Sequence, residues 1–291
     1  MKRSTQVLTL GALLAIAAAG SASAADLNDT TSFQHTLHFV GSGEHTLEVR
    51  TITGHITVEA YDGKDVEVLV DRTIDADSRI ERERADREVK LETTDNTDRI
   101  QLIVRPHDEP SCGEKNTTGW RHWDEHDYNV SYDFTIRVPK NTRLELCTIN
   151  DGDIVVSGTR GDFSLRSVNG RITMDDVGGS GEAKTVNGRV TATFATAPRE
   201  ASAFKTVNGD VVLEMPDRLA ADLRMKTFNG GLYTDFEVEP LVEPMNVSMH
   251  RQNGRFVYRS TGFTSVRAGG GGPELTLETM NGDVRVLRRS H

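Results

Sequence analysis

The stretch Ser167-Val168-Asn169-Gly170-Arg171-Ile172, followed by Thr185-Val186-Asn187-Gly188-Arg189-Val190, decides the fold because the same phrase returns along the chain. From Asn169 onward the asparagines of successive copies are separated by 18, 21, 21, 24 and 28 residues. One coil of a β-solenoid needs roughly 20 residues, so this spacing predicts stacked coils. The predicted repeat turns are Asn169, Gly170, Asn187, Gly188, Asn208, Gly209, Asn229, Gly230, Asn253, Gly254, Asn281 and Gly282.

Asn-Gly between apolar residues is also a strong β-hairpin signal. A two-residue hairpin at Asn169-Gly170 would set Val168 against Arg171, an apolar side chain against a charged one. If the chain instead runs on as a strand, Val168, Gly170 and Ile172 point inward and Asn169 and Arg171 point outward. We therefore predict that the chain continues through the motif.

The apolar alternation changes phase at each copy. Leu277 and Thr279 share one face with Leu275, and Met280 and Gly282 then take over the inward positions. A one-residue slip in every copy, repeated at Phe228, is what a corner between two flat faces would produce. Stacked coils would line up the asparagines as a ladder along one edge.

The N-terminal half departs from the repeat. We expect strands at Asp65–Thr73, Glu88–Thr93, Arg99–Arg105 and Asn129–Val138, and one short helix within Ala76–Arg87. The predicted fold is all-β: a single-stranded, β-helix-like solenoid, expected to be right-handed, with an irregular N-terminal β cap and one short helix. The predicted divisions are 1–24, a signal peptide; 25–139, the cap with an inserted loop at 106–127; and 140–291, the repeat solenoid, which forms one continuous elongated domain with the cap.

The first residues predict export. Lys2 and Arg3 precede an apolar stretch too short to span a bilayer, and Ala22-Ser23-Ala24 fits a signal-peptidase site, so the mature chain is expected to begin at Ala25. No second long apolar run follows and no cysteine lies at the cleavage site. We expect a periplasmic or secreted protein with no membrane span in the mature chain.

The charge balance excludes one class of partner. The 291 residues include 34 Lys and Arg against 44 Asp and Glu, a formal net charge of −10. Nucleic-acid binding needs clustered basic residues to contact phosphates, so no nucleic-acid partner is expected.

Export also changes how the two cysteines are interpreted. In an oxidising compartment Cys112 and Cys147 are expected to pair, and two unpaired thiols are the alternative. Their separation does not resemble a zinc knuckle, which needs close-spaced pairs.

The 106–127 loop holds the most unusual side chains. It contains His107, and His122 and His126 at a spacing of four would share one face of a helix and could chelate a metal. The segment lacks helical periodicity and the zincin glutamate, so no metal site is predicted. Trp120 and Trp123 are the only tryptophans of the chain. They are candidate partner contacts, and the alternative is that a ring covers the open end of the core.

Two further sets of residues are candidates for chemistry. Stacking would align the residues that follow Asn-Gly into a row of mixed charge, which is typical of a solvated face: His55, Asp153, Arg171, Arg189, Asp210, Gly231, Arg255 and Asp283. Acids at the turns could suit polysaccharide cleavage, but no pair is marked as catalytic: Asp151, Asp153, Asp162, Asp175 and Asp176. No nucleophile elbow or phosphate loop is present, so we predict no enzyme activity and no cofactor.

The Thr-Val-Asn-Gly copies, the Val138-Pro139 turn before them and the signal peptide resemble a bacterial exported β-strand-repeat family labelled "putative adhesin", a domain of unknown function. The resemblance covers about Leu37 to Val286 and implies a β-solenoid on the cell envelope or outside the cell. The predicted function is binding or scaffolding of a cell-envelope component, a glycan or a protein. The alternatives are a polysaccharide-degrading enzyme on a β-helix scaffold and a purely structural envelope protein.

Overall fold

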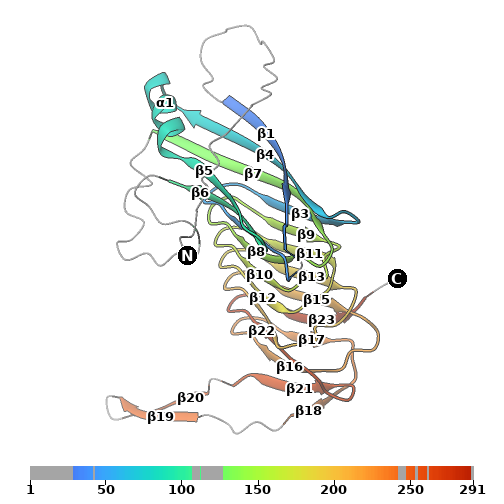
Figure 1. Ribbon diagram of the computed structural model, residues 1–291. Helices are drawn as coiled ribbons and strands as arrows, with labels where there is room; N and C mark the ends of the chain where they lie inside the picture. Colours follow the sequence, from blue (N-terminus) through green and yellow to red (C-terminus); the bar gives the residue numbers. More distant parts are fainter. Residues whose placement is uncertain are drawn as a thin grey trace, which may run out of the picture.

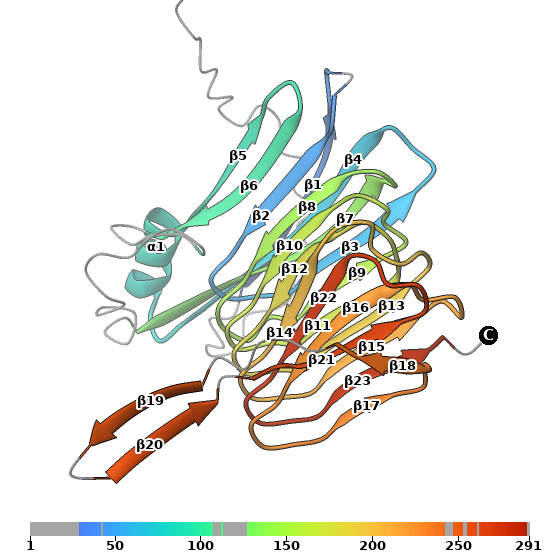
Figure 2. The ribbon, with the colours of Figure 1, turned by 90° about the horizontal axis from the view of Figure 1, so that it is seen from below.

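The structure is a computed structural model that describes residues 29–41, 43–106, 112, 127–241, 247–252, 255–260 and 262–289. Within these ranges the fold is all-β with two large sheets and one short helix, as the sequence predicts. The two sheets lie face to face like the layers of a sandwich (Figures 1 and 2) and share one hydrophobic core.

Within each sheet the spatial order of the strands differs from their order in the sequence. In spatial order, sheet A contains β1 (Asp29–His38), β4 (Asp65–Ala76), β7 (Tyr128–Pro139), β3 (Ile56–Tyr61), β9 (Ile154–Ser157), β11 (Ile172–Val177), β13 (Val190–Phe194), β15 (Val211–Met215), β23 (Val284–Arg288) and β17 (Leu232–Thr234). Sheet B contains β18 (Val238–Pro240), β21 (Thr264–Ala268), β16 (Ala221–Lys226), β22 (Glu274–Glu278), β14 (Ser202–Lys205), β12 (Gly181–Lys184), β10 (Phe163–Arg166), β8 (Arg143–Cys147), β2 (Thr46–Arg50), β6 (Arg99–Arg105) and β5 (Lys90–Asp95). A separate hairpin pairs β19 (Val247–Gln252) with β20 (Arg255–Ser260), and it projects away from both sheets (Figure 2).

From β8 to β17 the chain alternates between the sheets. We call a strand of sheet B and the sheet A strand that follows it across an Asn-Gly corner a rung. Neighbouring rungs pair in parallel, and the first residue of each sheet A strand stacks on its equivalent: Ile154, Ile172, Val190 and Val211 lie side by side. All four side chains are fully buried, so this column forms the centre of the core.

The rungs do not stack in sequence order at either end. The last rung of the chain, β22–β23, lies between β14–β15 and β16–β17, because the chain leaves through β18 and β21 and then returns. At the other end β2–β3 lies between β8–β9 and the pair β6 and β7.

Antiparallel strands close the ends of the parallel stack. In sheet A, β4 pairs antiparallel with β7 and β1 pairs antiparallel with β4. In sheet B, β5 covers β6 at one end, and β21 covers β16 at the other. Helix α1 (Arg79–Glu88) begins at Ser78, whose side chain accepts a hydrogen bond from the Glu81 N–H, and it packs beside β4 and β7 through buried Ala85 (Figure 1).

One predicted side-chain direction is wrong. Val168, Met280 and Phe228 were expected to point inward, but they are 36%, 53% and 80% exposed. Ser167 and Thr279, the residues before Val168 and Met280, are buried. At these corners two consecutive residues, the apolar one and the Asn, therefore turn outward. The slip therefore lies one position later than the alternation of apolar residues indicates.

Candidate functional site: the Asn-Gly corner

The asparagines form a continuous hydrogen-bonded ladder along one corner of the stack. The Nδ2 of Asn169 donates to Oδ1 of Asn150 over 3.3 Å, Asn187 to Asn169 over 2.8 Å, and Asn208 to Asn187 over 2.8 Å. Asn281 then donates to Asn208 over 2.7 Å, and Asn229 donates to Asn281 over 2.7 Å. The order Asn208, Asn281, Asn229 is the order in which the rungs β14–β15, β22–β23 and β16–β17 stack in the sheets.

A second, buried ladder supports the first. The hydroxyl of Thr206 donates to the Gly188 carbonyl of the neighbouring rung over 2.8 Å, and Thr279 does the same to Gly209 over 2.8 Å. A Cβ added at Gly188 would lie 2.2 Å from the carbonyl oxygen of Gly170, so only glycine lets the rungs approach this closely. The corner is therefore held rigidly by backbone as well as side-chain bonds.

An apolar column runs beside the asparagine ladder. It consists of the residue before each Asn, in spatial order Ile149, Val168, Val186, Val207, Met280 and Phe228. Ile149 and Val207 are half-buried, whereas the other four are exposed, most of all Met280 at 53% and Phe228 at 80%. The repeat pattern in the sequence predicts that these side chains point inward, so sequence analysis did not identify the column as a surface feature.

A charged column runs along the other side of the ladder. Arg171 donates to Asp153 from its backbone N–H and from its guanidinium, and Arg189 pairs with Asp210 over 2.8 Å. The burial of Asp153 opposes its ionisation, but the Arg171 donors outweigh it and lower the pKa of Asp153. These residues, predicted as one row, are brought together and largely neutralise one another.

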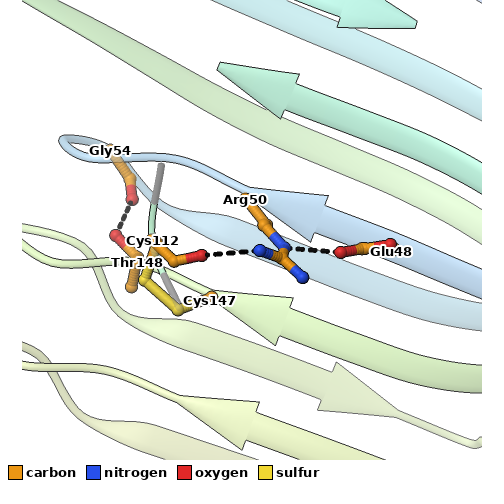
Figure 3. Close-up of a disulfide and its surroundings, with 6 residues drawn as sticks. All are labelled: Glu48, Arg50, Gly54, Cys112, Cys147 and Thr148. Carbon is orange, nitrogen blue, oxygen red and sulfur yellow. Dashed lines mark hydrogen bonds and ion pairs between the residues drawn. A yellow bond between two sulfur atoms is a disulfide. The ribbon is translucent and has the colours of Figure 1, made fainter. Parts of the chain in front are cut away.

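The disulfide joins the 106–127 loop to the same corner. Cys112 and Cys147 are bonded, with their Cα atoms 5.7 Å apart, which confirms the predicted pair. Cys147 directly precedes Thr148, whose hydroxyl donates to the Gly54 carbonyl over 3.1 Å (Figure 3). Arg50 lies beside the disulfide and donates to the Cys112 carbonyl over 3.2 Å.

The loop's own candidates lie outside the described residues: Trp120, Trp123, His107, His122 and His126. The repeat copy at Asn253 and Gly254 lies outside them too, and the strands that flank it pair antiparallel with Gln252 opposite Arg255. Among the described residues no group of three or more His, Cys, Asp or Glu side chains could hold a metal ion.

Two of the acids considered for polysaccharide cleavage, Asp176 and Asp162, accept hydrogen bonds within and between the turns. Asp176 accepts hydrogen bonds from Arg160 and Arg289, and the bond from Arg160 is the main reason that the pKa of Asp176 is lowered. Asp162 accepts the backbone N–H of Ser180 over 2.8 Å. A general acid needs a raised pKa, whereas the pKa values of Asp153 and Asp176 are both lowered.

The comparisons with known proteins give little beyond this geometry. No protein family model matches the chain and no curated protein matches it, so the resemblance to the β-strand-repeat family stays a prediction. The chain is similar to a "putative cell adhesion protein" from Clostridium sporogenes, with a TM-score of 0.43, 8% identity, and coverage of 90% of this chain and 100% of that one. It is also similar to a "putative adhesin" from Bacteroides fragilis (TM-score 0.37, 10% identity, 91% and 98% covered) and to a "putative lipid binding protein" from Parabacteroides distasonis (0.31, 10%, 89% and 96%). Scores this low carry no argument about function.

Helix α1, the one helix in the described ranges, is neither long nor apolar enough to cross a bilayer.

Proposed function

We propose that this chain is an exported binding protein of the cell envelope and that the Asn-Gly corner is its contact surface. The observation that carries the proposal is the apolar column, in which four of the six side chains are exposed and which ends in Met280 and Phe228. Apolar side chains gathered on a rigid surface mark interaction sites more often than scattered ones do.

The asparagine ladder adds regular polar contacts to this column. Each amide has two N–H donors and two acceptor lone pairs, and the ladder uses one of each between neighbouring rungs. Each rung therefore has one N–H donor and one lone pair left for a partner. These free groups repeat at the spacing of adjacent strands, about 4.8 Å. An apolar column beside a polar one fits an extended amphipathic partner, a glycan or a protein, that lies along the stack.

The rungs support the solenoid that we propose for the repeat region. Successive strands pass from one sheet to the other and stack in parallel with Ile172 beside Ile154 and Val190, the arrangement expected of coils. The disulfide supports export, because disulfides persist in oxidising compartments such as the periplasm or the extracellular space.

Trp120 and Trp123 are proposed as a second contact at the same corner. The Cys112–Cys147 bond holds Cys112, eight residues before Trp120, next to Thr148 at the start of the asparagine ladder. Aromatic side chains are favoured at contacts with proteins and sugars.

The experiment compares retention of purified residues 25–291 on immobilised envelope fractions. The variant F228S/M280S removes the two most exposed members of the column, and V40S/L69S is its matched control, because Val40 and Leu69 are 82% and 39% exposed in the β1–β2 connection and in β4. We expect retention to drop about tenfold in F228S/M280S and to be unchanged in the control.

Equal retention of all three proteins would contradict the corner as the contact surface. No retention of the unaltered protein would favour the purely structural alternative. A W120A/W123A variant in the same assay tests the second contact, and unchanged retention there would exclude it.

A further inference from the structure

An arginine-lined hollow lies between helix α1 and strand β4. These two elements lie at the end of the stack opposite the β19–β20 hairpin (Figure 1). Its volume is about 470 Å³, within the range of small-ligand sites. The lining residues are Arg72 and Ile74 from β4 and Arg79, Arg82, Glu83, Asp86 and Arg87 from α1.

The hollow is positive in an acidic protein. Four guanidinium groups line it against two carboxylates, whereas the whole chain has a formal net charge of −10. The helix separates its charges by face, since Arg84 pairs with Glu81 and Glu88 and none of these three lines the hollow. The remaining arginines of α1 face Arg72 on the neighbouring strand.

Donors are left over after the internal ion pairs are counted. Arg72 pairs with Asp86 over 2.8 Å, Arg79 pairs with Glu83 over 3.2 Å, and Arg82 pairs with Asp29. Each guanidinium has five N–H donors, and each of these contacts joins one nitrogen to one carboxylate oxygen.

Arg72 also lies over the Phe33 ring, 5.9 Å from its centroid, and interacts with the Tyr132 hydroxyl. Two features nevertheless leave donors for a ligand, one at Arg72 and one at Arg87. Only 16% of the Arg72 side chain is exposed, and its buried Nε has no hydrogen-bond partner. A buried donor without an acceptor destabilises the protein unless something else supplies the acceptor. Arg87 is exposed, and no ion pair involving it is found among the described residues.

We infer that this hollow binds an oxyanion, a phosphate or sulfate group. The planar donor fork of arginine matches the oxygen spacing of these groups and favours bidentate contacts. Exposed ion pairs such as Arg79 with Glu83 contribute little to stability, so the fold alone does not require this concentration of arginines. The group can come from a free inorganic ion or from a phosphate ester in an envelope lipid or polymer.

The test is calorimetric titration of the disulfide-bonded protein with inorganic phosphate, and separately with sulfate, at low ionic strength. R79Q/R87Q removes two exposed donors of the hollow, and R84Q is the control, because Arg84 lies on the same helix outside the hollow. We expect saturable binding that weakens about tenfold in R79Q/R87Q and less than twofold in R84Q. Absence of saturable binding, or equal weakening in R84Q, would overturn the inference.

Vesicles distinguish the two sources of the group. Retention on phosphatidylglycerol vesicles that is lost in R79Q/R87Q and competed by inorganic phosphate identifies a lipid headgroup as the source. Phosphate binding without vesicle retention identifies a free ion or a soluble ester. F228S/M280S should bind phosphate normally, so failure of the corner proposal can be told apart from failure of this one.

Discussion

Replacing Gly188 with alanine tests the close stacking of the corner most sharply. The added Cβ would lie 2.2 Å from the Gly170 carbonyl oxygen and 2.7 Å from its carbon, and both are backbone atoms that cannot rotate away. Real Cβ atoms essentially never approach closer than 3.0 Å, so the rungs must separate by at least 3.0 − 2.2 = 0.8 Å.

That separation breaks three hydrogen bonds at once. Asn187 donates its backbone N–H to the Val168 carbonyl over 2.7 Å, and its Nδ2 donates to Asn169 over 2.8 Å. Thr185 donates to Gly170 over 2.8 Å. Adding 0.8 Å takes each of them to the limit of a hydrogen bond or past it, and about 1 kcal/mol is lost per bond.

We therefore expect Gly188→Ala to lower the free energy of unfolding by about 3 kcal/mol, which is also the upper part of the range for overpacking. In a domain of this size that corresponds to a Tm lower by about 6–12 °C, measured by circular dichroism or calorimetry. Gly270→Ala is the control, because a Cβ there meets nothing within 4 Å. Equal Tm values for the two variants would refute the close stacking of glycine carbonyls.

Three further predictions concern the corner and its surroundings. Thr206→Val removes the hydroxyl that donates to the Gly188 carbonyl, which is partly buried and loses this partner, so urea unfolding should show a loss of about 1 kcal/mol; no loss would mean that the threonine ladder does not contribute. The pKa of Asp153 is lowered in the folded protein, so the carboxylate stabilises the fold above the unfolded pKa of 3.8, and this stabilisation is lost as the pH falls through the lower folded pKa. The free energy of unfolding, measured against pH, should therefore fall less steeply in this acid range in Asp153→Asn than in the unaltered protein. An identical profile would contradict the pair with Arg171. Reduction, or C112S/C147S, opens a loop with a sequence separation of 35 and should cost about 4 kcal/mol in chemical denaturation, and a change below about 1 kcal/mol would show that the 106–127 loop is held by other contacts.

The repeat made much of the fold predictable. Alternating apolar residues indicated an all-β chain, and the Asn-Gly spacing of roughly 20 residues indicated that Asn169, Asn187 and Asn208 would align. The pairing of Cys112 with Cys147 followed from the expected compartment. These features depend on local pattern and composition, which a single sequence contains.

The order of the rungs could not be predicted. Each rung offers its neighbours the same aliphatic column and the same Asn, so Asn281 fits beside Asn208 as well as Asn229 would. What decides the order is the path through β18 and β21, which pair antiparallel with each other and close the end of sheet B. Equivalent interfaces leave this choice to distant connections.

Much of the candidate site was hidden for a related reason. The alternation of apolar and polar residues along the strands shows that the inward-facing positions shift by one residue near Phe228, but it does not show which residue turns outward. That choice depends on the hydrogen bond from Thr227 to the Gly282 carbonyl, 2.8 Å long, which keeps Thr227 directed into the stack. The arginine hollow was likewise out of reach, because Arg72 and α1 meet only in the folded chain.

Site-specific photo-crosslinking tests the central claim, that the corner is the contact surface, most directly. A benzophenone side chain would replace Phe228, which is 80% exposed in the apolar column, or Val40, which is 82% exposed in the connection between β1 and β2, and each protein would be irradiated with envelope fractions. We predict a discrete adduct from position 228 and none from position 40. Adducts from position 40 alone, or from neither position while the protein is retained on the envelope, would contradict the claim.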